Sequence, residues 1–115
     1  MRILIVDDEP LIAADIEMTL LDAGHQVVAN AQHLSTALEA LERHPADFAI
    51  LDANLGGKSA EPIADDLKRR GIPYMILTGY TRDQIGPWAK DSVVIGKPVT
   101  AEMLLAHLPA QAALN

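Results

Sequence analysis

Residues 2–10 read Arg-Ile-Leu-Ile-Val-Asp-Asp-Glu-Pro, a short aliphatic run that ends in three acidic residues and a proline. Such a run, rich in aliphatic and β-branched residues and bounded by a turn signal, is typical of a buried strand in a parallel sheet. Pro10 suits the first turn of a following helix, where its missing N–H is no loss. The stretch therefore predicts a strand, an acidic strand end and a helix in direct succession.

The same alternation continues along the chain. Four further short apolar runs, at 26–29, 48–51, 74–77 and 92–95, are separated by longer segments with helical spacing of apolar residues. Because parallel strands need crossover connections, this order predicts an α/β fold with a flavodoxin-like, doubly wound five-stranded parallel sheet. The expected strand order is 2-1-3-4-5, with helices on both faces. Segment 81–90 has only a weak apolar stripe, so any helix there is expected to be short or mobile.

Length and composition narrow the class of protein. The 115 residues carry 16 acidic and 9 basic side chains and no cysteine. This length predicts a single domain over residues 1–115, and the lack of cysteine excludes a disulfide scaffold or a cysteine-ligated metal. The acidic balance argues against a nucleic-acid partner, and no apolar run is long enough for a signal peptide or a membrane span. We therefore expect a cytoplasmic domain, either stand-alone or cut from a longer protein.

Polar side chains follow four of the five predicted strands. Asp7 and Asp8 follow the first, Asp52 follows the third, Thr78 follows the fourth and Lys97 follows the fifth. Ligands of doubly wound sheets bind beyond the carboxyl ends of the strands, so these residues are expected to share one crevice. Each residue alone has an ordinary explanation, as a first-turn acid, a turn residue or a surface lysine. Their coincidence at the strand ends is what predicts a site.

The residue types indicate phosphoryl chemistry. Three carboxylates in one crevice repel one another, and a hard divalent cation such as Mg²⁺ neutralises them best. Lys97 adds a positive charge, and the Thr78 hydroxyl can donate a hydrogen bond to a phosphate oxygen. A carboxylate nucleophile with a cation and donors around it can carry phosphoryl transfer to an aspartate.

The segments ILIVDDEP, AILDANL, YMILTGY and VIGKPVTAEML, in this order and spacing, resemble the receiver domain of bacterial two-component response regulators. The resemblance covers essentially the whole chain. It implies that Asp52 accepts a phosphoryl group from a sensor histidine kinase or a histidine phosphotransferase. It also implies Mg²⁺ as the cofactor, with Asp52 and Asp8 as carboxylate ligands. Asp7 would then act largely through water, and Asn54 would offer its backbone carbonyl.

The resemblance further implies a switching device. Thr78 matches the hydroxyl that moves toward the phosphoryl group, Lys97 matches the lysine that pairs with it, and the Lys97–Pro98 bond is expected to be cis. The family often has an aromatic ring three residues before that lysine, whereas Val94 stands there. The Thr-Gly-Tyr sequence at 78–80 resembles a receiver subgroup with a Phe-Ala-Thr-Gly-Tyr style motif, so Tyr80 is a candidate for the missing aromatic signal. A second departure is Leu-Gly-Gly-Lys at 55–58, where a proline and a glycine are common.

The predicted function is a phospho-accepting receiver that switches a surface for a downstream protein partner or passes the phosphoryl group on, and not a turnover enzyme. One alternative is a degenerate receiver that binds partners independently of phosphorylation. A phosphatase of the haloacid dehalogenase type is disfavoured, because that family has an Asp-x-Asp motif after its first strand, whereas Asp7 and Asp8 are adjacent. A flavodoxin is disfavoured because no phosphate-binding loop follows the first strand. Trp88 is interpreted either as a locally packed ring or as part of a partner surface.

Overall fold

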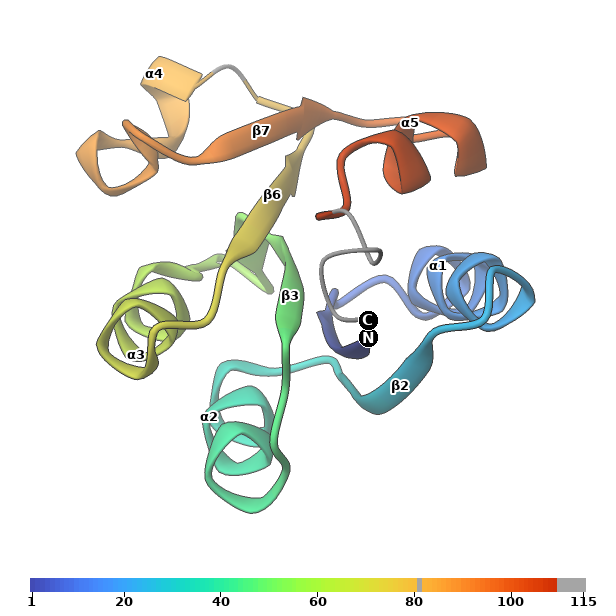
Figure 1. Cartoon of the computed structure of the whole chain (residues 1–115). Coiled ribbons are helices and arrows are strands. Elements are labelled where there is room, and N and C mark those ends of the chain that lie inside the picture. Colours follow the sequence, from blue (N-terminus) through green and yellow to red (C-terminus); the bar gives the residue numbers. More distant parts are fainter. Residues whose placement is uncertain (81, 110–115) are drawn as a thin grey trace.

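The computed structural model describes residues 1–80 and 82–109. A parallel sheet of five strands forms its centre, in the order β2-β1-β3-β6-β7 (Figure 1). The strands are β1 (Arg2–Val6), β2 (Gln26–Ala31), β3 (Phe48–Asp52), β6 (Tyr74–Thr78) and β7 (Val93–Gly96). When only the five strands of this sheet are numbered, in chain order, this is the predicted 2-1-3-4-5 order. The α/β fold class is confirmed.

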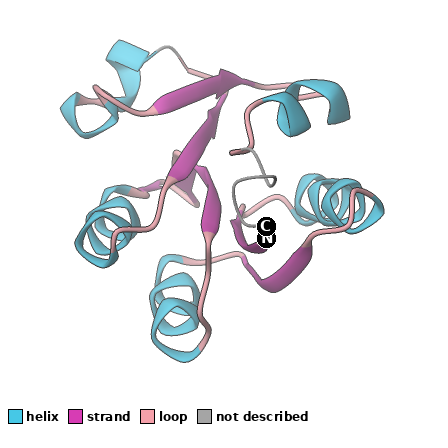
Figure 2. Ribbon diagram, in the orientation of Figure 1, coloured by secondary structure: helices cyan, strands magenta, loops and turns pink. Residues whose placement is uncertain are grey.

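The helices divide between the two faces of the sheet (Figures 1 and 2). α1 (Pro10–Asp22) and α5 (Ala101–Ala106) pack on one face, and α2 (Leu34–Arg43) and α3 (Glu61–Arg70) pack on the other. The alternation of side chains along each strand makes this possible. In β1, for example, Ile3 and Ile5 belong to the core under α1 and α5, whereas Leu4 and Val6 belong to the opposite core.

Proline, glycine and threonine residues mark several of the helix ends. Pro10 occupies the first turn of α1, and Gly24, just beyond the end of this helix, has a left-handed φ of 90°. Thr100 caps α5, because its hydroxyl oxygen accepts a hydrogen bond from the backbone N–H of Met103 at 3.1 Å. The Lys97–Pro98 bond that leads into this helix is cis, as the resemblance implies.

The segment before β7 contains little helix. α4 (Arg82–Ile85) has four residues and is followed by a short 3₁₀ turn, η1 (Pro87–Ala89). This confirms the expected short helix, except that Thr81 lies outside the described residues. Trp88 is only 9% exposed and packs into the core on the α2 and α3 side, which confirms local packing of its ring.

A small hairpin after β3 was not predicted. β4 (Asn54–Leu55) and β5 (Lys58–Ser59) pair antiparallel around Gly56 and Gly57, whose φ values are 59° and 86°. Two consecutive positive φ values are what a two-residue type I′ hairpin turn requires, and glycine adopts them without steric cost. The Leu-Gly-Gly-Lys departure at 55–58 is thus the turn of a hairpin beside the predicted site.

Candidate functional site

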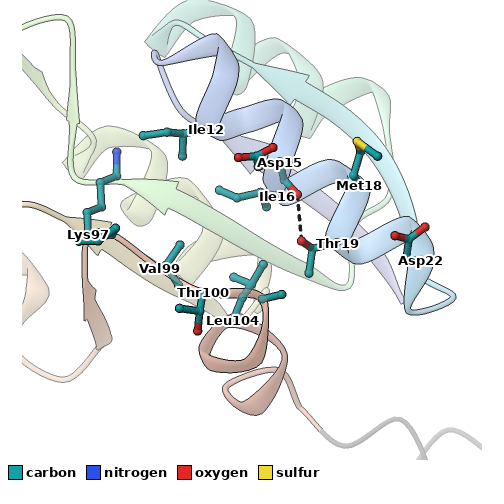
Figure 3. Close-up of a pocket in the computed structure, with 12 residues that line it drawn as sticks. Ile12, Asp15, Ile16, Met18, Thr19, Asp22, Lys97, Val99, Thr100 and Leu104 are labelled. Atoms are coloured by element: carbon teal, nitrogen blue, oxygen red, sulfur yellow. Dashed lines mark hydrogen bonds between the residues drawn. The ribbon is translucent and has the colours of Figure 1, made fainter.

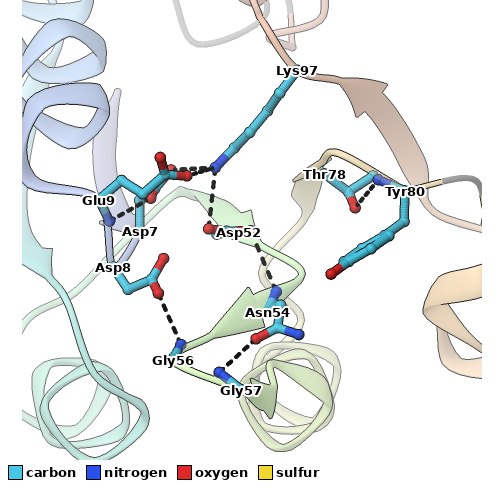
Figure 4. A network of polar contacts seen from close by, with 10 residues as sticks. All are labelled: Asp7, Asp8, Glu9, Asp52, Asn54, Gly56, Gly57, Thr78, Tyr80 and Lys97. Carbon is cyan, nitrogen blue, oxygen red and sulfur yellow. Dashed lines mark hydrogen bonds and ion pairs between the residues drawn. The ribbon is translucent and has the colours of Figure 1, made fainter.

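The carboxyl ends of four strands bring the predicted polar residues together (Figure 4). Asp7 directly follows β1, Asp52 is the last residue of β3, Thr78 is the last residue of β6 and Lys97 directly follows β7. The register of the sheet sets how far along the strand direction each of these residues lies, since Asp52 pairs with Leu77 and Thr78 pairs with Gly96. The residues line or adjoin one open cavity, of about 470 Å³, at this edge of the sheet.

Lys97 is the cation at the centre of the cluster. Its Nζ lies 3.1 Å from Asp52 Oδ2, 3.3 Å from Asp7 Oδ2 and 2.9 Å from Glu9 Oε1. Burial by itself lowers the pKa of Lys97, but the hydrogen bond to Glu9 and the charges of Asp52 and Asp7 outweigh it, so the pKa is raised. Lys97 therefore stays protonated over the physiological pH range.

Asp52 is a buried carboxyl, with a residue exposure of 6%. Burial raises its pKa from 3.8 to about 6, and the charge of Asp7 acts in the same direction. The Lys97 ammonium and the backbone N–H of Asn54, which donates to Asp52 Oδ1 at 3.3 Å, partly offset this rise. At neutral pH the carboxyl is still mainly ionised, as a nucleophile must be.

The four acidic side chains form a group that suits a hard cation. One carboxylate oxygen from each of Asp7, Asp8, Glu9 and Asp52 lies within 4.8 Å of the others. Asp7 is 1% exposed, and its Oδ2 accepts no hydrogen bond within the described part of the chain, although Lys97 approaches it. Four negative charges face one ammonium, and carboxylate oxygens are the ligands that Mg²⁺ prefers. The residues present therefore fit Mg²⁺.

The β4–β5 hairpin borders the acidic group. The Asp8 carboxylate accepts a hydrogen bond from the backbone N–H of Gly56 at 2.8 Å, and the Asn54 side-chain oxygen accepts one from Gly57 N–H at 2.8 Å (Figure 4). The side chain of Asn54 thus holds the turn. The hairpin fixes the backbone of residue 54 next to Asp52 and orients Asp8 at the same time.

Thr78 and Tyr80 stand on the other side of the cavity. Thr78 is buried, and its hydroxyl oxygen accepts a hydrogen bond from the backbone N–H of Tyr80 at 2.9 Å. Tyr80 is 53% exposed and lines the cavity. Val94 lies within β7, paired with Ile76 and packed against the core, so it belongs to the sheet and not to the cavity.

Glu9 is the residue of this site that the sequence analysis missed. Its place in an acidic run before a helix is adequately explained by the helix dipole. In the structure, however, the Glu9 side chain makes no capping hydrogen bond and contacts Lys97 instead. The only local signal was that the acidic run continues for a third residue after Asp7 and Asp8.

A second hollow adjoins the site between α1 and α5 (Figure 3). It has a volume of about 420 Å³, and Lys97 lines both hollows. Its floor is apolar, with Ile12 and Ile16 from α1 facing Val99 and Leu104, and acidic side chains of α1 stand along it.

Comparison with known proteins now decides the family. Residues 3–108 match the family model of the response regulator receiver domain. The chain belongs to this family. As a receiver domain it is a module of two-component signalling, which confirms the resemblance drawn from the sequence.

This receiver domain is similar to regulators of several bacteria. It is 32% identical to the chemotaxis protein CheY of Pseudomonas aeruginosa over 90% of both chains. The solution structure of SdrG from Sphingomonas melonis Fr1 is 37% identical with a TM-score of 0.82, covering 99% of this chain and 95% of that one. A response regulator from Burkholderia pseudomallei, crystallised with a phosphorylated aspartic acid and a calcium ion, is 25% identical with a TM-score of 0.82, covering 98% and 69%.

Other relatives are much longer. The receiver domain spans less than half the length of several curated regulators, among them the transcriptional regulatory protein PdtaR of Mycobacterium tuberculosis, of which it covers 45%. Among the helices that the structure describes, none has the length and apolar character needed to cross a bilayer.

Proposed function

We propose that this receiver accepts a phosphoryl group on Asp52 from a phosphohistidine of a sensor histidine kinase or a histidine phosphotransferase, in a Mg²⁺-dependent reaction. The observation that carries the proposal is the position of Lys97 Nζ, 3.1 Å from Asp52 Oδ2, within a group of four carboxylates. A buried carboxylate nucleophile beside a fixed cation is the arrangement that phosphoryl transfer to aspartate requires.

In the proposed transfer, an Asp52 carboxylate oxygen attacks the phosphorus atom. A new oxygen–phosphorus bond forms, the phosphorus–nitrogen bond of the donor breaks, and its electron pair returns to the imidazole nitrogen. The Lys97 ammonium stabilises charge on the phosphoryl oxygens. Asp7, Asp8, Asp52 and the backbone carbonyl of Asn54 would hold Mg²⁺, which supplies further positive charge there when bound. We expect one phosphoryl group per molecule and no catalytic turnover.

The aspartyl phosphate would act as a switch through Thr78. The phosphoryl group carries a charge of about −1.5 to −2, in place of the single charge of the Asp52 carboxylate. The Thr78 oxygen accepts a hydrogen bond from the Tyr80 N–H and still has its own O–H to donate to a phosphoryl oxygen, so a shift of Thr78 toward the phosphoryl group would carry the Tyr80 backbone with it. This change would reach Tyr80 and the surface of α4, β7 and α5, where we place the docking site of a downstream protein. Because Val94 has no ring to move, Tyr80 is our candidate for the aromatic signal.

The donor protein has to cover the mouth of the site, and α1 offers a surface for it. Leu11 and Met18 are 83% and 63% exposed on this helix. Met18 also lines the hollow between α1 and α5 (Figure 3). Exposed apolar side chains next to a reactive site are typical of protein contacts. We place the phosphohistidine donor on this face.

The direct test is incubation with acetyl phosphate and Mg²⁺, followed by intact-mass measurement. We expect one added phosphoryl group on the native protein and none on Asp52→Ala. A phosphotransfer profile against purified histidine kinases then identifies the donor. If the native protein gains no phosphoryl mass from any donor, the proposed function is wrong, and a phosphorylation-independent interaction module becomes the better description.

A further inference from the structure

The Glu9–Lys97 contact is an ion pair that the proposed transfer does not use. Glu9 lies at the N-terminus of α1, and its Oε1 is 2.9 Å from Lys97 Nζ, shorter than the distances from Nζ to Asp52 and Asp7 (Figure 4). The two residues are 88 positions apart in the sequence. Because Glu9 makes no capping hydrogen bond, this contact is what orients its side chain.

Lys97 has as many close anionic partners as it has donors. An ammonium group offers three N–H bonds. Lys97 donates hydrogen bonds to Glu9 and Asp52 and forms an ion pair with Asp7. A phosphoryl oxygen that approaches Asp52 can therefore accept a hydrogen bond from Lys97 only if one of these three carboxylates moves away from the ammonium group.

The three partners differ in what their displacement costs. Asp7 is 1% exposed, so it would be left as a buried charge without its cation. Asp52 is the acceptor itself and keeps its charge while the phosphoryl group approaches. The Glu9 side chain is 56% exposed, so water can solvate it as soon as it leaves Lys97. Glu9 is thus the partner that is released most easily.

We infer that Glu9 is a positioning residue that competes with the incoming phosphoryl group for Lys97 and thereby slows the phosphorylation of Asp52. This inference rests on the proposed function, since it describes the regulation of the same site. The ion pair stabilises the unmodified protein and is lost as the transition state forms. Removing it should therefore lower the barrier and leave the nucleophile in place.

The experiment compares Glu9→Gln with wild type at saturating Mg²⁺, so that any loss of metal affinity does not limit the rate. Phosphorylation is followed by intact mass with two donors, acetyl phosphate and phosphoramidate, the second of which carries less negative charge at neutral pH. We expect Glu9→Gln to react about two- to fivefold faster with both donors, as fits an ion pair with one exposed partner. Glu42→Gln, which removes the same charge from an exposed position on α2, should react like wild type.

Each outcome decides the inference. Equal or slower labelling of Glu9→Gln overturns it but leaves the proposed function intact. Acceleration with acetyl phosphate alone overturns it too, because donor repulsion would then explain the effect. Failure of wild type to be labelled overturns both. Urea denaturation of each variant separates a change in folding stability, which a purely structural role would produce, from a change in rate.

Discussion

Replacing Asp52 by asparagine should stabilise the metal-free protein at neutral pH. Asp52 has a pKa of about 6 in the folded protein against an ordinary value of 3.8, chiefly because it is buried. The folded protein therefore binds this proton more tightly than the unfolded chain does, and folding stability falls as the pH rises through this interval. Asparagine keeps the size of the side chain without the charge.

The size of the effect follows from the two pKa values. The difference between about 6 and 3.8 corresponds to a penalty of about 3 kcal/mol once the carboxyl is ionised in both states, at about pH 7. At about pH 5 the same values leave about half of that penalty, and below about pH 4 little remains. The advantage of Asp52→Asn over wild type should thus grow by about 1–2 kcal/mol between about pH 5 and pH 7.

Urea denaturation followed by circular dichroism, at both pH values and with a chelator present, measures this difference. Asp65→Asn is the matched control, since Asp65 is exposed on α3 and should change stability by less than about 0.5 kcal/mol at either pH. An Asp52→Asn variant less stable than wild type at neutral pH would refute the reasoning. So would a stability difference that does not depend on pH, because burial of a charged carboxyl would then not be the cause.

Three other outcomes are expected. Saturating Mg²⁺ should raise the urea midpoint of wild type by offsetting the acidic charges, and should do so much less in Asp8→Asn; equal increases in both proteins would contradict the metal site. Leu11→Glu should slow phosphotransfer from the cognate protein donor at least tenfold and leave labelling by acetyl phosphate unchanged, and an equal effect on both donors would argue against docking on α1. Tyr80→Ala should leave the labelling rate within about twofold of wild type but weaken phosphorylation-dependent partner binding about tenfold, as measured by calorimetry. Unchanged binding would remove Tyr80 from the switch.

The sheet and most of the site could be predicted because their signals are local. A short apolar run predicts each strand. Because the carboxyl ends of parallel strands lie at the same edge of the sheet, the polar residues that follow these runs are expected to meet there, namely Asp7, Asp52, Thr78 and Lys97. The short α4 was predicted in the same way, from the weak apolar stripe of segment 81–90.

Two features were missed because they depend on distant partners or on a turn type. Glu9 has a sufficient local explanation as a helix N-terminal acid, and only the folded chain brings Lys97 to it across 88 positions. The hairpin around Gly56 and Gly57 was within reach of the sequence, since a Gly-Gly pair between two short runs is a hairpin signal. The family pattern, in which a proline and a glycine are common at these positions, carries no such signal, so only the turn chemistry of the Gly-Gly pair predicts the hairpin.

The hydrogen bond between the Asp8 carboxylate and the Gly56 amide has a practical consequence. The amide proton of residue 56 senses the electron density of a carboxylate in the acidic group directly. Its nuclear magnetic resonance signal should therefore shift whenever that carboxylate takes a new neighbour. A single backbone resonance in a glycine turn can thus report occupancy of the pocket without any chemical probe being attached to the protein.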